Sequence, residues 1–443
     1  MMIADKALTA VSPALDTGKV GRLLAAEVIP RHLELRDLKV KRLRYHPGEC
    51  ATILYDAKLY DSRSGWLQRT WLSGAIYPDG EAQSLAQSLT EPGSPAGLPV
   101  AAYVSDLRAL IQSFPHDWRM PALKAYLEGS SPALAAFLPG HGDSDGKCAP
   151  IAEILPIRYR PGKMATLRVS LKENPAARCS ANATFYVKLR AEADGFGISE
   201  RLRSLSESGR QRGFRIVSPV AHFEADRAVV CEPAPGSSFA DLIRSEQPIE
   251  EPARRIGHGL AAFHMSDPSA LPRDNRKRFF AKATESVRVI EWACPPMAAA
   301  ANRILSRLED LPPPSVLGPV HYDLKPEHIF LDRDGVIHFI DNDTARADDP
   351  AIDVGRLSAM LDTLEHLAGV ARDRIVAAKR GLLEGYLEGD ASAWRDRIGA
   401  ARAYGALLVA KHWIQWRRPG WQSRVPLELE RAWSSLESPT SAE

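Results

Sequence analysis

Apolar side chains mark elements of both secondary-structure types along the N-terminal part of this chain. Within residues 1–40 they recur at helical spacing, which predicts an amphipathic helix; these positions are Val20, Leu23, Leu24 and Val28. Residues 41–145 mix strand and helix patterns. They end in the sequence GHGDSDGK at 140–147, and such a run of glycine, aspartate and serine is typical of a linker.

The two regions after this linker differ from each other in pattern. Residues 150–235 are rich in strand patterns, whereas residues 236–443 are mostly helical apart from one hairpin. We therefore expect an α+β protein with three domains, at 1–145, 150–235 and 236–443.

One motif occurs twice, once on each side of the linker. Residues 44–52 read RYHPGECAT and residues 158–166 read RYRPGKMAT, so RYxPGxxAT is shared. A strand pattern lies on both sides of each copy, and a further strand follows at 70–75 and at 184–189. The order of elements predicts an internal duplication of a small α+β lobe. The alternative is a common hairpin turn that matches by chance.

The two copies differ in their third strand. The second copy has Lys188 there, and the first has Gly74 at the position that we align with it. If this lysine takes part in chemistry, only the second copy can do so.

The C-terminal region contains a short hairpin that carries several polar residues. IFL at 329–331 and VIHFI at 336–340 are strand patterns joined through Asp334-Gly335, a strong turn signal. A loop with Asp323 leads into this hairpin, and Asp341 follows it. We therefore expect Asp323, His328 and Asp341 to lie at one end of the ribbon. Two carboxylates held in this way suit phosphoryl transfer, where one accepts a proton and the other holds Mg²⁺.

The loop at 321–328 reads HYDLKPEH. It resembles the catalytic loop of protein kinases (HRDLxxxxN) and, more closely, that of aminoglycoside phosphotransferases and related small-molecule kinases. Residues 342–355 lack the Phe-Gly and Ala-Pro-Glu of protein kinases and contain Asp-Pro-x-x-Asp-x-Gly, as in the phosphotransferases. The resemblance, over about residues 150–440, implies a two-lobe protein-kinase-like fold, with a strand-rich N-lobe and a helical C-lobe. The duplication adds a degenerate N-lobe-like domain in front.

The resemblance also implies roles for the residues of the loop. Asp323 would be the catalytic base, His321 would brace the loop, and Asp341 would bind Mg²⁺ on the phosphates of ATP. His328 stands where the family usually has Asn. Because Mg²⁺ prefers oxygen ligands, His328 would bind a softer metal such as Mn²⁺, donate to a phosphate, or only lie near the site. Asp343 would be a further metal ligand or a turn residue.

Further residues are assigned by the same resemblance. Asp353 would cap the following helix and tie down the catalytic loop. The residues that would contact the nucleotide are Lys188 with Glu200 as its partner (Glu207 being the alternative), Gly162 and Lys163 in the phosphate loop, Glu232 in the hinge, and Lys325. Three tryptophans among basic residues at 411–421 would either stack on an acceptor or pack in the core.

Composition narrows the class of protein. There are 57 Lys and Arg residues against 55 Asp and Glu, a net charge of +2, which gives no reason to expect nucleic acid or a membrane surface as partner. The five cysteines form no CxxC pair, which favours a reducing, cytoplasmic location. We expect transfer of the γ-phosphoryl of ATP to a hydroxyl of a small molecule of the aminoglycoside, sugar or amino-alcohol class. The alternatives are a non-catalytic nucleotide-binding scaffold and, less favoured, a protein kinase.

Overall fold

The chain folds into two compact units. The computed structural model describes residues 5–78, 80–89, 97–138, 151–171, 183–192, 209, 212–389 and 391–437. Unit 1 consists of Met1–Ala193, Pro219–Pro233 and Ile414–Pro419, and unit 2 of Asp194–Ser218, Ala234–Trp413 and Gly420–Glu443. No helix in the described ranges is both long and apolar enough to cross a membrane.

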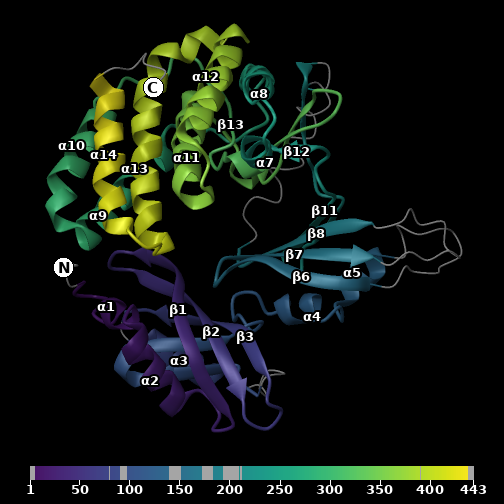
Figure 1. The fold of residues 1–443 in the computed structure, drawn as a ribbon, viewed down its shortest axis with the longest axis vertical. Helices are drawn as coiled ribbons and strands as arrows, with labels where there is room; N and C mark the ends of the chain where they lie inside the picture. Colours follow the sequence, from purple (N-terminus) through teal and green to yellow (C-terminus); the bar gives the residue numbers. More distant parts are fainter. Residues whose placement is uncertain are drawn as a thin grey trace, which may run out of the picture. The chain divides into compact units, whose positions relative to one another are not determined.

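Unit 1 is rich in strands (Figure 1). Its strands are β1 (Leu33–His46), β2 (Cys50–Asp61), β3 (Leu67–Ile76), β4 (Ala101–Val104), β5 (Ala109–Ser113), β6 (Ile151–Arg160), β7 (Met164–Leu171), β8 (Thr184–Arg190), β10 (Ala221–Phe223) and β11 (Ala228–Cys231). Its helices are α1 (Val11–Ala14), α2 (Thr17–Glu27), α3 (Glu81–Ser88), α4 (Leu123–Leu127) and α5 (Pro132–Phe137), with a 3₁₀ turn at Ser105–Leu107.

The amphipathic helix expected near the N-terminus is α2. Its first amides are capped by the Asp16 side chain, and Val20 and Leu24 are buried on one face. The helix pattern does not extend to residue 40, because a long strand begins at Leu33 and pairs with β2 along its whole length. Side chains that alternate between the two faces replace the helical spacing there.

The two sheets of unit 1 have the same strand order. The first runs β1-β2-β3-β5-β4 and the second β6-β7-β8-β11-β10, and every neighbouring pair is antiparallel. The register corrects one detail of the expected alignment. Thr166 pairs with Lys188, and the matching Thr52 pairs with Ala75 rather than Gly74. Ala75 is therefore the residue of the first sheet at the position of Lys188.

The first RYxPG turn is bound by an aspartate from outside its hairpin. The Tyr45 hydroxyl and the Gly48 amide both donate to Asp5 Oδ2, at 2.6 and 2.9 Å. Gly48 has a φ of 78°, which other residues rarely adopt. The tyrosine and glycine of the motif thus act together as a carboxylate-binding pair.

The second RYxPG turn is bound in the same way. The Tyr159 hydroxyl and the Gly162 amide both donate to Asp117 Oδ2, at 3.0 and 2.7 Å, and Asp117 is buried. Within unit 1 the two sheets also share one core, where the Trp71 and Phe114 rings lie 6.0 and 5.0 Å from the Tyr159 ring.

Unit 2 is mainly helical. Its helices are α7 (Phe239–Arg244), α8 (Glu250–His264), α9 (Lys277–Ala293), α10 (Ala298–Glu309), α11 (Ala351–Ala368), α12 (Arg372–Glu388), α13 (Ile398–Trp416, whose end belongs to unit 1) and α14 (Trp421–Glu437). Short 3₁₀ turns cover Pro295–Met297, Pro326–His328, Asn342–Thr344 and Ala391–Arg397. The strand-rich N-terminal part and helical C-terminal part expected from the sequence are both present (Figure 1).

Unit 2 also contains more strands than the single hairpin that the sequence predicts. The strands are β9 (Phe214–Ile216), β12 (Ser237–Ser238), β13 (Gly318–Val320), β14 (Ile329–Leu331), β15 (Ile337–Phe339) and β16 (Arg346–Asp348). Four of them form a sheet in the order β12-β14-β15-β9, with β9 parallel to β15, and β13 pairs with β16. Strands of two or three residues give too little sequence pattern to be recognised.

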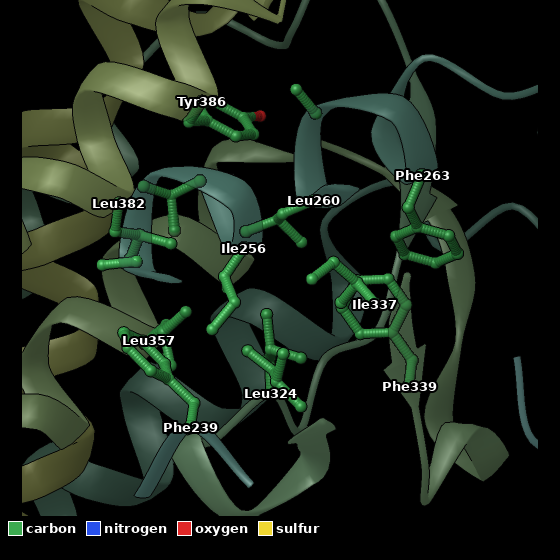
Figure 2. Close-up of a cluster of buried hydrophobic side chains, with 14 of the residues drawn as sticks. Phe239, Ile256, Leu260, Phe263, Leu324, Ile337, Phe339, Leu357, Leu382 and Tyr386 are labelled. Carbon is green, nitrogen blue, oxygen red and sulfur yellow. The ribbon is translucent and has the colours of Figure 1, made fainter. Parts of the chain in front are cut away.

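One hydrophobic core supports this small sheet. Figure 2 shows Leu324, Ile337 and Phe339 among buried side chains of the surrounding helices. Leu324 is fully buried, and it directly follows Asp323 in the chain. The apolar half of the loop at 321–328 is therefore fixed in the core, which leaves its polar residues at the edge.

Candidate active site

The hairpin of β14 and β15 positions the polar cluster. Gly335 takes a φ of 80° in its turn, as the Asp334-Gly335 signal predicts. At the other end of the ribbon, one ligand atom from each of Asp323, His328 and Asp341 lies within 4.8 Å of the other two. The grouping expected from the hairpin is thus present in the structure.

Asp353 holds the loop that carries Asp323. It is fully buried, and its carboxylate accepts the amide N–H of His321 at 2.6 Å and that of Tyr322 at 2.9 Å. These bonds hold Tyr322 in the left-handed region, at a φ of 64°. The expected helix cap is wrong, however, because α11 begins before Asp353 and the residue preceding the helix, Pro350, has no side-chain cap.

The His321 ring links the two ends of the hairpin. Its Nε2 lies 2.9 Å from the carbonyl oxygen of Ile340, which can only accept, so Nε2 carries the proton. Its Nδ1 then accepts the amide N–H of Asp323 at 3.2 Å. The ring is fully buried and makes these contacts as a neutral imidazole. Such contacts position the loop and leave no ring nitrogen for proton transfer.

Asp323 is held between two cations. Lys325 Nζ lies 2.8 Å from its Oδ2, and the Arg356 guanidinium forms an ion pair with its Oδ1. Burial opposes ionisation of Asp323, but the charges of Lys325 and Arg356 outweigh it and hold the pKa of the carboxyl well below its ordinary value. About a fifth of the side chain (22%) remains exposed, so a reactant can reach the carboxylate.

His328 presents a lone pair to Asp341. Its Nδ1 lies 2.9 Å from the carbonyl oxygen of Asp323 and therefore donates to it. Burial and the nearby charge of Lys325 lower the pKa of His328 to about 3, so its Nε2 is unprotonated. This nitrogen lies 3.6 Å from Asp341 Oδ2. Two electron-pair donors face each other here, an arrangement suited to a shared cation.

The donor set fits a divalent metal ion that accepts a nitrogen ligand besides carboxylate oxygens. Two carboxylates suit Mg²⁺, while the imidazole of His328 suits Mn²⁺ better, because Mg²⁺ rarely takes nitrogen ligands. Asp343 is not in the group of three. It lies in the 3₁₀ turn Asn342–Thr344 that follows Asp341.

The residues expected to contact the nucleotide lie in different parts of the chain. Lys325 is in unit 2 beside Asp323, whereas the remaining described ones belong to unit 1 and are Lys188, Gly162, Lys163 and Glu232. Glu200 and its alternative Glu207 lie outside the described residues. The Gly162 amide donates to Asp117, so this amide is already committed to a carboxylate.

Two residues that the sequence reasoning missed contact the catalytic loop. Arg356 is 4% exposed and pairs with Asp323, and Lys282 Nζ lies 3.4 Å from the carbonyl oxygen of Tyr322. For Arg356 a signal was available. It stands in the run AIDVGRLSAML at 351–361, which is apolar apart from Asp353, Arg356 and Ser358, and a buried arginine in such a run needs an acidic partner.

The tryptophans near the C-terminus contribute to packing. Trp413 is 2% exposed and its Nε1 donates to Glu428 at 3.3 Å, and Trp421 is also buried. Of the two interpretations of this stretch, core packing accounts for these two side chains.

The central segment of the chain is similar to a known family. Residues 200–391 match the Phosphotransferase enzyme family. No curated protein matches the chain.

Solved structures with low sequence identity are similar to this chain. A choline/ethanolamine kinase family protein from Mesorhizobium loti is 17% identical, over 73% of this chain and 97% of that one, with a TM-score of 0.45. Choline kinase from Cryptosporidium parvum is 9% identical, over 69% and 94%, with a TM-score of 0.48. A thermostable aminoglycoside phosphotransferase mutant, solved with AMP-PNP and hygromycin B, is 15% identical, over 70% and 99%, with a TM-score of 0.45.

The family match covers the catalytic loop, the hairpin and the Asp-Pro-x-x-Asp-x-Gly segment. Residues 200–391 are therefore similar to the Phosphotransferase enzyme family, in agreement with the resemblance predicted from the sequence.

Proposed function

We propose that this protein transfers the γ-phosphoryl group of ATP to a hydroxyl of a small molecule. The observation that carries the proposal is the group formed by Asp323, His328 and Asp341, whose ligand atoms lie within 4.8 Å of one another. A base and a metal-binding carboxylate at this separation are what phosphoryl transfer from a nucleotide requires. The family of residues 200–391 supports the same reaction class.

In the proposed mechanism the side chains mainly position the reactants. Asp323 accepts the proton of the attacking hydroxyl, and His321 and Asp353 hold its loop in place. His328 and Asp341 would hold a divalent cation, which neutralises charge on the phosphates when bound. Lys325 adds a positive charge 2.8 Å from the base. Orientation and charge neutralisation would supply most of the rate.

Unit 1 would supply the nucleotide contacts. Lys188 would bind the α- and β-phosphates with Glu200 as its partner, and Glu232 would lie in the hinge that contacts adenine. Since the Gly162 amide already donates its hydrogen bond to Asp117, the Lys163 side chain is the better candidate for a phosphate contact in this turn.

The N-terminal region would be a duplicated, degenerate N-lobe. Support comes from the identical strand order of the two sheets and from the matching bonds of Asp5 and Asp117 to the RYxPG turns. It has Ala75 where the second sheet has Lys188, so it would not bind phosphates in the same way. The domains proposed on this basis are 1–145, 150–235 and 236–443.

The test uses Asp323→Asn in the full-length protein with ATP, Mg²⁺ or Mn²⁺, and a panel of aminoglycosides, sugars and amino alcohols. Product mass and ADP release are measured together with ATP affinity. We expect turnover to fall about 10²–10⁴-fold, while the Kd for ATP stays within about threefold. The control is Asp334→Asn, the same change at the exposed hairpin turn, which should leave both unchanged. Equal loss of turnover and ATP affinity in Asp323→Asn would refute the assignment of the base.

A non-catalytic nucleotide-binding protein is the second candidate. It is favoured by the two cations on Asp323, because a carboxylate with a strongly lowered pKa is a weak base. Saturable ATP binding by the wild-type protein, without ADP release under any metal and acceptor condition, would favour this candidate over the first.

A further inference from the structure

Basic side chains from two helices, α9 and α11, lie close to Asp323 and its loop. Arg356 of α11 pairs with Asp323 Oδ1, while Lys325 holds Oδ2. Lys282 of α9 contacts the carbonyl of Tyr322, the residue before Asp323. The charges that act most strongly on Lys282 are those of Arg356, Asp323, Arg278 and Lys411. Asp323 therefore has Lys325, a candidate for a nucleotide contact, on one carboxylate oxygen and Arg356 of α11 on the other.

Close packing of the helices fixes this arrangement. A Cβ at Gly355 would lie 2.1 Å from the backbone carbon of Ala401, and one at Gly405 would lie 2.5 Å from the carbonyl oxygen of Gly355. The α11 and α13 backbones thus touch at the residues next to Arg356 and Tyr404. These two side chains are consequently held near each other by the backbones that carry them.

The cations of this cluster are paired unequally with carboxylates. Lys411 pairs with Glu285 at 3.2 Å, and Arg278 lies 3.9 Å from Asp274. Arg356 and Lys325 both pair with one carboxylate, that of Asp323. Within the part of the chain that the structure describes, no carboxylate lies at ion-pair distance from Lys282. Burial and the charge of Arg356 lower the pKa of Lys282 well below its ordinary value, and the opposing charge of Asp323 offsets them only in part.

Two buried polar groups of the cluster also lack hydrogen bonds. Arg356 Nε and the Tyr404 hydroxyl have no partner among the described residues, although Arg356 is 4% exposed and Tyr404 is fully buried. Buried donors are satisfied in the great majority of cases, so two in one cluster call for a ligand. Both groups can donate, and both lie beside cations. A negatively charged oxygen ligand would satisfy them.

We propose that the cluster of Lys282, Arg356 and Tyr404 binds an oxyanion carried by the acceptor, a carboxylate or a phosphate ester. The inference rests on the proposed phosphotransferase function and names its substrate class as a hydroxylated acid or a phosphorylated alcohol. The acceptor hydroxyl must reach Asp323, and Arg356 of the cluster contacts the carboxylate oxygen that Lys325 does not. A polycationic acceptor would be repelled by the same charges.

The first experiment compares acceptors that differ mainly in charge. D-glucose, D-gluconate and D-glucosamine, and then glycerol and D-glycerate, are offered to the full-length protein with ATP and Mn²⁺. We expect kcat/KM for the carboxylates to exceed that for the neutral and cationic compounds by at least about tenfold. Lys282→Gln should raise the KM of the acid about 10- to 100-fold and leave the KM of ATP within about twofold. Preference for a neutral or cationic acceptor would overturn the inference and leave the phosphotransferase in place.

The second experiment does not depend on turnover or on finding the natural acceptor. Inorganic sulfate is titrated at constant ionic strength, with ADP and Mg²⁺ present, and its Kd is measured by calorimetry. Lys282→Gln should weaken sulfate binding about tenfold or more, and Lys282→Arg should retain it within about threefold. The control is Lys277→Gln, an exposed lysine of the same helix, which should bind sulfate as the wild type does.

The outcomes separate the two proposals. Equal sulfate affinity in wild type and Lys282→Gln overturns the anion site, whatever the transfer assay shows. A rise in the KM of ATP instead of that of the acid also overturns it, because the lysine would then serve the nucleotide. Sulfate binding that depends on Lys282 supports the anion site even if no acceptor is phosphorylated, a result that would count against the phosphotransferase alone. The Tm of each variant without sulfate shows that it is folded.

Discussion

The carboxylate of Asp353 should be essential to the shape of the catalytic loop. Replacing it with Ala leaves the amides of His321 and Tyr322 buried without an acceptor, and each such group costs about 1–3 kcal/mol. Asp353→Ala should therefore destabilise unit 2 by about 2–6 kcal/mol. Asp353→Asn keeps the shape and one acceptor oxygen, so about half of this loss, 1–3 kcal/mol, is expected.

Urea unfolding combined with amide hydrogen exchange would measure both effects. The peptide that covers the catalytic loop, residues 318–328, should exchange faster in both variants, because its two anchoring bonds are weakened or lost. Exchange resolved by peptide is needed, since a chain of two units need not unfold in one step.

A matched control lies on the same helix. Glu365 lies at the surface, 3.5 Å from the exposed Arg372 and 3.8 Å from the His366 ring, and Glu365→Gln should change the stability by less than about 0.5 kcal/mol. A loss in Asp353→Ala no larger than that of the control would show that the loop holds its conformation without this carboxylate.

Three further outcomes are expected. Gly355→Ala should lower the free energy of urea unfolding by about 1–3 kcal/mol, because its Cβ would lie 2.1 Å from backbone. The control Gly21→Ala, whose Cβ would meet only a side chain at 3.5 Å, should be neutral or stabilising by up to about 1 kcal/mol. Equal losses in the two variants would contradict the close approach at Gly355. Tyr159→Phe removes a bond to the buried Asp117 and should cost about 1–3 kcal/mol, and no loss would show that this bond is dispensable. His328→Asn should shift the ratio of Mn²⁺- to Mg²⁺-supported activity about tenfold or more toward Mg²⁺, and an unchanged ratio would remove His328 from the metal site.

Local patterns made the hairpin predictable. Asp334-Gly335 between two apolar runs specifies a tight turn, and the turn brings the ends of the ribbon together. The closeness of Asp323, His328 and Asp341 followed from sequence positions that lie within a short stretch of chain.

For contacts across longer distances the sequence indicated at most that a partner is needed, as for Arg356, and not which residue it is. Arg356 meets Asp323 only because α11 packs behind the loop, and neither residue indicates the other in the sequence. The same holds for Asp117, which binds the second RYxPG turn from a segment outside the hairpin.

The register of the third strand of the first sheet could not be predicted from its sequence. Gly74 and Ala75 are neighbours, so a shift of one residue exchanges them, and no motif in this strand fixes the pairing. The pairing of β3 with β2 places Ala75 at the position that Lys188 has in the second sheet. Neither residue is a lysine, so the first copy differs from the second in the same way in either register.

The strand β9 makes the helical unit inseparable from the chain that precedes it. Phe214 and Ile216 belong to the core of unit 2, and β9 completes its sheet by parallel pairing with β15. The chain then returns to unit 1 for Pro219–Pro233 before it enters unit 2 again. A polypeptide that starts at residue 236 would thus lack an edge strand and expose Ile337 and Phe339. Segments of the two units alternate along the sequence, so no single cut in the chain separates one complete unit from the other.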